Sequence, residues 1–333
     1  MISRYSGSLG SAAVCVAVLG SNYLPAQGLP VTAKAATSAS RNWTAPRTAD
    51  GQPDLQGVWT NSTLTPLERP AQFAGKPVLT EQEASVYVKQ LLQQVNSDRR
   101  DGGLQTDVGR AYNEFWRDRG NNLVADRRTS LISDPPDGKI PALTPEARKR
   151  VDESRAWMEE HATDGPEGRS LAERCMAWTT AGPPMLPGPY NNDLQIFQAH
   201  NAVVIVNEMI HDARVIPLDG RPHVSPNIRE WLGDSRGHWE GDTLVVDTTN
   251  FISQYSFRGS DMNLHLTERF TRVSPDVIQY EFTIDDPTAF TKPWTARIPL
   301  NKTSDRVYEY ACHEGNYAMA DILAGARASE KKK

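Results

Sequence analysis

The chain has 333 residues, with 36 lysines and arginines against 41 aspartates and glutamates, which gives a formal net charge of −5. Hydrophobic residues make up 38% of the chain, as in folded globular proteins. The mild acidity and the lack of a long basic run argue against a partner bound through its phosphate backbone, so we expect no nucleic acid.

The first 36 residues have the pattern of a signal peptide. Arg4 precedes an apolar stretch from Leu9 to Leu19, and the small-residue motif Ala33-Lys34-Ala35 follows. This order is typical of secretory signals, and the apolar stretch is too short to span a bilayer. We therefore predict a signal peptide over residues 1–36, no integral membrane segment, and a periplasmic or secreted protein.

A linker and the start of a single domain are predicted next. Residues 37–56 are rich in Ser, Thr, Pro and Gly and show no hydrophobic period, so they are predicted to be a linker. The domain is expected to span residues 57–330, beginning with a strand at Gly57.

Helices are predicted between this first strand and the rest of the domain. The capping box from Thr80 to Glu83 predicts one helix, and Thr144-Pro145 predicts a second, which ends near residue 160. A further capping box, from Ser170 to Glu173, predicts a short helix through Cys175. These helices form an expected insertion at about residues 80–178.

The second half of the chain is predicted to be β-structure. Short connections with turn residues imply antiparallel neighbours, and so many strands either close into a barrel or form two packed sheets. The fold class is therefore mainly β, an antiparallel barrel or closed sandwich with a helical insertion. The expected strands are 193–199, 202–209, 211–217, 236–240, 243–249, 264–273, 276–285, 293–300 and 306–313, with a helix over 317–327 that caps the sheet.

Two resemblances accompany this pattern. The tripeptide Gly57-Val58-Trp59 resembles the G-x-W motif in the first strand of lipocalins and other calycins, which implies a calycin-like barrel. The blocks DLQGVW (residues 54–59) and GDTLVV (residues 241–246) resemble those of a large group of uncharacterised secreted bacterial proteins. The second resemblance implies a secreted bacterial origin and no particular reaction.

Two cysteines follow the predicted signal peptide. An even number of cysteines in an oxidising compartment predicts a disulfide between Cys175 and Cys312. The alternative is a catalytic thiol at Cys312 beside His313, but neighbours on a strand point to opposite faces and make a poor nucleophile–base pair. We therefore expect the disulfide.

Motifs for common cofactors are missing from the sequence. There is no Gly-rich phosphate loop, and no G-x-S-x-G motif of a serine hydrolase. The spacings Glu208-x-x-His211 and His265-x-x-Glu268 would place each pair on opposite faces of a strand. We expect no cofactor and no metal, although a metal site built across several strands stays open.

The densest polar cluster lies at residues 208–214. If the strand there runs straight, Glu208, Asp212 and Arg214 share one face with Val and Ile side chains. Charged groups on an apolar face cost several kcal/mol unless they are paired or hydrated, and such places often carry function. The structural alternative is an ion pair of Arg214 with Glu208 or Asp212.

Glu268 is the second buried carboxylate expected from alternation, because Leu266 and Phe270 flank it at even spacing. His265 then lies on the opposite face. We predict Glu208 or Glu268 as a general acid whose pKa is raised by apolar surroundings, and His211 or Asp212 as a base. Arg214 would orient a substrate carboxylate or keep the base ionised.

The aromatic residues of the β-region are expected to form the core and to line a small-molecule site. The loop from Ile252 to Asn263 is long enough to act as a lid over that site. The residues expected to bind substrate are Tyr255, Phe257, Arg258, His265 and Tyr310.

These observations favour a cofactor-independent enzyme that acts on a hydrophobic or aromatic small molecule. Lyase, isomerase, hydratase and cyclase reactions all need only carboxylate and histidine acid–base chemistry. One alternative is a non-catalytic carrier of a hydrophobic ligand. Another is a carbohydrate hydrolase, which would require two carboxylates at a defined separation.

Overall fold

The computed structural model describes residues 43–110, 113–178, 180–255 and 257–331. These residues belong to one compact unit. The predicted signal peptide, residues 1–36, lies outside the described residues. Within the described part, no helix is long and apolar enough to cross a membrane.

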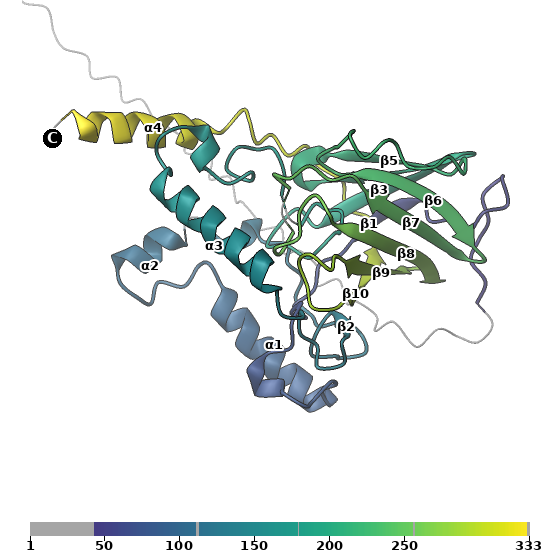
Figure 1. Ribbon diagram of the computed structural model, residues 1–333. Helices are drawn as coiled ribbons and strands as arrows, with labels where there is room; N and C mark the ends of the chain where they lie inside the picture. The colour runs from purple at the N-terminus through teal and green to yellow at the C-terminus, as the bar shows by residue number, and fades with distance from the viewer. Residues whose placement is uncertain (1–42, 111–112, 179, 256, 332–333) are drawn as a thin grey trace, which may run out of the picture. The chain divides into compact units, whose positions relative to one another are not determined.

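Ten strands form one antiparallel sheet (Figure 1). Nine of them follow the order β5-β4-β3-β1-β10-β9-β8-β7-β6, and β2 pairs with β10 beside this path. The mainly β, antiparallel prediction is confirmed, since the nine strands form a nearly closed barrel. The strands are β1 (Gly57–Thr60), β2 (Ile132–Asp134), β3 (Asp193–Ala199), β4 (Ala202–Asn207), β5 (Ala213–Pro217), β6 (Asp234–Glu240), β7 (Thr243–Thr249), β8 (His265–Ser274), β9 (Val277–Asp285) and β10 (Trp294–Lys302).

The barrel approaches closure where its two edge strands, β5 and β6, lie against each other. Gly237 on β6 makes this approach tight. A Cβ atom there would lie 2.8 Å from Cγ2 of Ile216 and 2.7 Å from Cδ2 of Leu218. Because those contacts are shorter than van der Waals distance, glycine lets Ile216 on β5 and Leu218, which follows β5, fill the seam.

Alternation along the strands places the core inside the barrel. On β8, Leu266, Glu268 and Phe270 are buried while the residues between them are partly exposed. Large side chains with almost no exposed surface fill the interior, and each contributes about 1.5–3 kcal/mol through burial. They include Trp59, Phe270, Tyr280, Phe282 and Trp294.

The segment before β1 packs on the barrel. Leu55 has no exposed surface, and its amide donates to Oε1 of Gln198 at 2.6 Å. The indole nitrogen of Trp59 donates to the carbonyl of Leu55 at 3.0 Å, and the Arg272 guanidinium lies 5.4 Å from the Trp59 ring. The described part of the expected linker, residues 43–56, is therefore tied to the core.

Four α-helices and four short 3₁₀ helices complete the described fold. The capping box at Thr80 is present, with its side chain accepting from the Glu83 amide, and Thr144 caps the helix that begins at Pro145. The α-helices are α1 (Glu81–Val95), α2 (Leu104–Gly109), α3 (Pro145–Glu160) and α4 (Tyr317–Glu330). The 3₁₀ helices are η1 (Ala71–Phe73), η2 (Glu114–Trp116), η3 (Pro166–Gly168) and η4 (Met209–His211).

Three local predictions are wrong. Residues 170–178 form turns instead of a helix, although the side chains of Ser170 and Glu173 make the capping-box hydrogen bonds. Residues 306–313 form no strand, since the amide of Tyr308 donates to a side chain instead of a neighbouring strand. The terminal helix α4 exists but buries no residue, so it does not cap the sheet as expected.

Candidate functional site

A hairpin turn interrupts the segment that was expected to run straight. Strand β4 ends at Asn207 and β5 begins at Ala213, and the two pair antiparallel. The amide of Asn207 donates to the carbonyl of Asp212 at 3.1 Å, which closes the turn. The prediction of one shared face for Glu208, Asp212 and Arg214 is therefore wrong, because the chain reverses between them.

The backbone of this turn is strained. Ile210 has φ of 66° and His211 has φ of 49°, both in the left-handed region. This conformation is unfavourable for a β-branched residue such as isoleucine and persists only where the surroundings enforce it. Burial of Met209 and Ile210 against Ala181 supplies that enforcement. The strained turn leaves the His211 side chain exposed.

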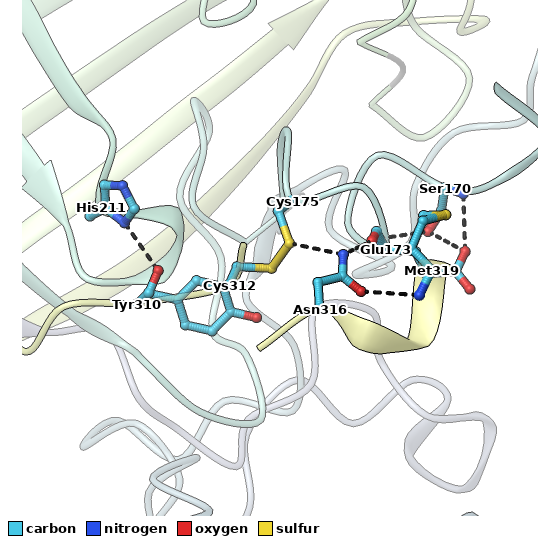
Figure 2. The surroundings of a disulfide bond; sticks show 8 residues. All are labelled: Ser170, Glu173, Cys175, His211, Tyr310, Cys312, Asn316 and Met319. Atoms are coloured by element: carbon cyan, nitrogen blue, oxygen red, sulfur yellow. Dashed lines mark hydrogen bonds between the residues drawn. A yellow bond between two sulfur atoms is a disulfide. The ribbon is translucent and has the colours of Figure 1, made fainter. Parts of the chain in front are cut away.

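A hydrogen bond defines the tautomer of His211. Its Nδ1 atom lies 3.1 Å from the carbonyl oxygen of Tyr310 (Figure 2). A carbonyl can only accept, so Nδ1 carries the proton and Nε2 of the neutral ring is an acceptor. The exposed imidazole thus presents a basic nitrogen away from its anchored side.

The segment that anchors His211 is itself held in place. The amide of Tyr308 donates to Oε1 of Glu208 at 3.0 Å, so this segment contacts the turn at two points. Cys312 forms a disulfide with Cys175, with a Cα–Cα distance of 5.8 Å (Figure 2). The predicted disulfide is confirmed, and it fixes the chain two residues beyond Tyr310.

Carboxylates of raised pKa surround the turn. Burial raises the pKa of Glu208, which is 5% exposed, and burial also raises the pKa of Asp212. Burial raises the pKa of Asp193 to about 7, and the nearby charges of Glu208 and Asp118 act in the same direction. The sequence reasoning missed Asp193, because its place at the start of a strand carried no signal of burial.

Aromatic side chains lie beside the same turn. Trp178, Tyr190 and Tyr310 are partly buried and pack against Met209 and Ile210. The rings of Trp178 and Tyr190 are 6.1 Å apart at a tilt. These aromatic rings supply apolar surface next to the polar groups. Tyr310 is one of the residues predicted to bind substrate.

The other predicted charged residues meet inside the barrel. Arg214 donates to Oε2 of Glu268 at 2.7 Å, and the two side chains are almost fully buried. Tyr280 donates to Oε1 of Glu268 at 2.8 Å and accepts from the amide of Met185 at 3.1 Å. The structural alternative, a pairing of Arg214 with Glu208 or Asp212, is wrong, because the hairpin directs Arg214 toward Glu268 on β8. This geometry does not favour Glu268 as a general acid, since its carboxylate accepts on both oxygens.

The predicted lid loop is divided between the core and the surface. Tyr255 is buried and donates to the carbonyl of Pro183 at 3.3 Å, and burial raises its pKa. Phe257 is also buried and stacks on Trp294 with ring centres 6.2 Å apart. Arg258 alone of the three is exposed. The two aromatic residues therefore anchor the loop to the core.

His265 lies on the outer face of the barrel, opposite Glu268 as predicted. It belongs to a chain of alternating carboxylates and imidazoles that spans β6, β7 and β8. Nε2 of His265 lies 2.5 Å from Asp247, whose other oxygen lies 2.8 Å from Nε2 of His223. Nδ1 of His223 lies 2.7 Å from Asp234. A carboxylate therefore lies at each ring nitrogen of His223.

Among the described residues, no three His, Cys, Asp or Glu side chains are arranged to hold a metal ion. Comparisons of this chain with protein-family models, with curated proteins and with solved structures find no match.

Proposed function

We propose that this protein is an enzyme that performs acid–base chemistry on a hydrophobic or aromatic small molecule, with His211 as the base. The observation that carries the proposal is the strained turn, which holds Nδ1 of His211 on the Tyr310 carbonyl and leaves Nε2 exposed as an acceptor. Strain of this kind is typical of functional positions.

The carboxylates beside the turn complete the chemistry. Asp193, with a pKa of about 7, and Glu208, whose pKa burial also raises, can each hold a proton where ordinary carboxylates are ionised. Nε2 of His211 would take a proton from a carbon of the substrate, and Asp193 or Glu208 would deliver one elsewhere on it. The two proton transfers rearrange the bonds of the substrate without a net oxidation or reduction, so no electron acceptor is needed. Isomerases, lyases, hydratases and cyclases work in this way.

The neighbouring residues have supporting roles in this proposal. Trp178, Tyr190 and Tyr310 would contact the apolar part of the substrate. The Arg214–Glu268 pair, braced by Tyr280, would hold β5 and the start of the turn in position. Residues of the predicted site that lie elsewhere, His265 and Arg258, take no part in this step.

We also propose that the protein acts in the periplasm or outside the cell. The Cys175–Cys312 disulfide supports an oxidising compartment. The resemblance of the DLQGVW and GDTLVV blocks to secreted bacterial proteins agrees with this location.

The test is solvent-deuterium incorporation. Wild-type protein and the His211→Asn variant are incubated with a small-molecule extract of a bacterial culture in D2O, and the products are compared by mass spectrometry. We expect compounds that gain carbon-bound deuterium with the wild type and not with His211→Asn. His200→Asn, which alters an imidazole that is 86% exposed on a turn of the barrel, is the matched control.

Equal labelling by wild type and His211→Asn would show that His211 is not the base. A compound that is retained by the protein but neither labelled nor converted would instead favour the non-catalytic carrier.

A further inference from the structure

A groove outside the His211 turn lies between α3 and the loop that precedes β8. It has a volume of about 520 Å³, which is in the range of small-molecule sites. Its apolar walls include Leu143, Val151 and Phe290. Its charged lining consists of Glu68, Arg148 and Arg258, so the lining carries a net charge of +1.

Neither arginine is neutralised by a partner among the residues that the structure describes. The guanidinium groups of Arg148 and Arg258 make no hydrogen bond and no ion pair there, and both side chains are exposed. The single acidic group in the lining, Glu68, accepts the amide of Ile140 at 3.1 Å through Oε1. Two unpaired guanidinium groups on one apolar groove form an arrangement that favours an anion.

The backbone that presents Arg258 has left-handed angles. Arg258 has φ of 59° and Gly259 has φ of 101°. A Cβ atom at Gly259 would lie 2.8 Å from Cδ2 of Leu143, and the positive φ there also favours glycine, so the loop packs closely against the groove wall.

Hydrogen bonds of the neighbouring residues hold the same turn in place. Phe257 and Ser260 exchange backbone hydrogen bonds of 2.8 and 3.0 Å. The Ser260 hydroxyl donates to Asp286, which is 1% exposed. The Asp286 carboxylate also accepts from the amide of Thr288 at 2.9 Å. Arg258 therefore projects from a preformed support, which lowers the entropy cost of binding a ligand.

We propose that this groove, here called the two-arginine groove, binds a small amphiphilic anion, namely a carboxylate carried on a short alkyl or aromatic body. The carboxylate would lie between Arg148 and Arg258, and the apolar body would lie along Leu143, Val151 and Phe290. The proposal is independent of the His211 chemistry, because the two sites share no residue.

Isothermal titration calorimetry tests the proposal, with octanoate and 3-phenylpropionate as probes and their uncharged amides as controls. We expect the carboxylates to bind and the amides to bind at least about tenfold more weakly, as for the loss of one charge-assisted contact. Arg148→Gln and Arg258→Gln should each weaken carboxylate binding about five- to tenfold, and both substitutions alter exposed side chains. Arg155→Gln on α3, whose side chain is 66% exposed outside the groove, is the matched control and should bind like wild type. His211→Asn should also bind like wild type.

Several outcomes would overturn the proposal. These are the absence of heat with both carboxylates, equal affinity for acids and amides, or equal weakening by Arg155→Gln. Binding to phosphatidylglycerol vesicles is measured as well, to test for a membrane surface. Binding to vesicles that depends on Arg148 and Arg258, without binding of the monomeric acids, would replace the small-molecule site with a membrane surface.

Discussion

The ring of His211 is held by the backbone of Tyr310, a residue 99 positions later in the chain, through a hydrogen bond of 3.1 Å. This contact joins the strained turn between β4 and β5 to the segment that ends in the disulfide. It determines which nitrogen of the imidazole can act as a base.

His211→Asn should lower turnover by about 10²–10⁴-fold, because a general base is lost. The melting temperature should change little, since the side chain is exposed and makes one hydrogen bond with the residues that the structure describes. Deuterium incorporation and thermal unfolding measure the two effects. A loss of activity that follows only the folded fraction would show that His211 serves the structure.

Removal of the disulfide in the double variant Cys175→Ser, Cys312→Ser should destabilise the fold. The bridge joins residues 137 positions apart, and the chain-entropy relation gives about 4–5 kcal/mol for a loop of that length. Activity should also fall under conditions where the variant stays folded, because Tyr310 loses its anchor. Denaturant unfolding measures the stability. Two thiols that alkylate freely in the unreduced wild type would contradict the bridge itself.

Asp193→Asn should change how stability depends on pH. Burial raises the pKa of Asp193 to about 7 in the folded state, against 3.8 for an unperturbed carboxyl. The folded protein then binds more protons than the unfolded chain between these values, so stability falls as pH rises from about 4 to about 7. The variant should lose this part of the decline and be more stable than wild type above about pH 7. Identical pH profiles of chemical unfolding would refute the raised pKa.

Breaking the interior ion pair should be costly. Glu268→Gln leaves Arg214 without its counter-charge inside the barrel, and such changes cost about 3–5 kcal/mol. The double variant Arg214→Met, Glu268→Leu removes both charges and should recover most of that loss. Urea unfolding of the two variants gives the comparison. If the double variant is no more stable than Glu268→Gln, the penalty does not come from an unpaired buried charge.

The His265–Asp247 contact on the outer face of the barrel should stabilise the protein only at low pH. The hydrogen bond to Asp247 raises the pKa of His265. A raised pKa in the folded state gives a stabilising contribution that is present below the ordinary histidine pKa and is lost as pH rises through the folded value. His265→Asn should therefore reduce stability at about pH 5 and have little effect at about pH 9. The effect should not exceed about 1 kcal/mol, since the group is 43% exposed. A loss of equal size at both values would exclude an ionic contribution.

The local sequence pattern was enough to predict most of the strands, the faces of their side chains and the disulfide. Alternation and turn residues predicted eight of the strands that form the barrel, with ends within a few residues. They also predicted that Glu268 and His265 face opposite sides of the sheet, because side chains at odd spacing on a strand alternate between its two faces. Two cysteines in an expected oxidising compartment were enough to predict their bridge.

The tertiary structure decided which side chains interact with one another. Glu268 on β8 meets Arg214 on β5 because both side chains are buried inside the barrel, and no spacing along the chain encodes that distance. Burial in the folded chain raises the pKa of Asp193 and of Glu208, whereas the hydrogen bond from the distant Tyr308 amide acts on Glu208 in the opposite direction. The turn at Ile210 and His211 adopts left-handed angles that local preference opposes, and long-range packing and the anchored Tyr310 carbonyl stabilise them. Local sequence sets which face a side chain takes, whereas its charge state and its partner depend on what the folded chain brings against it.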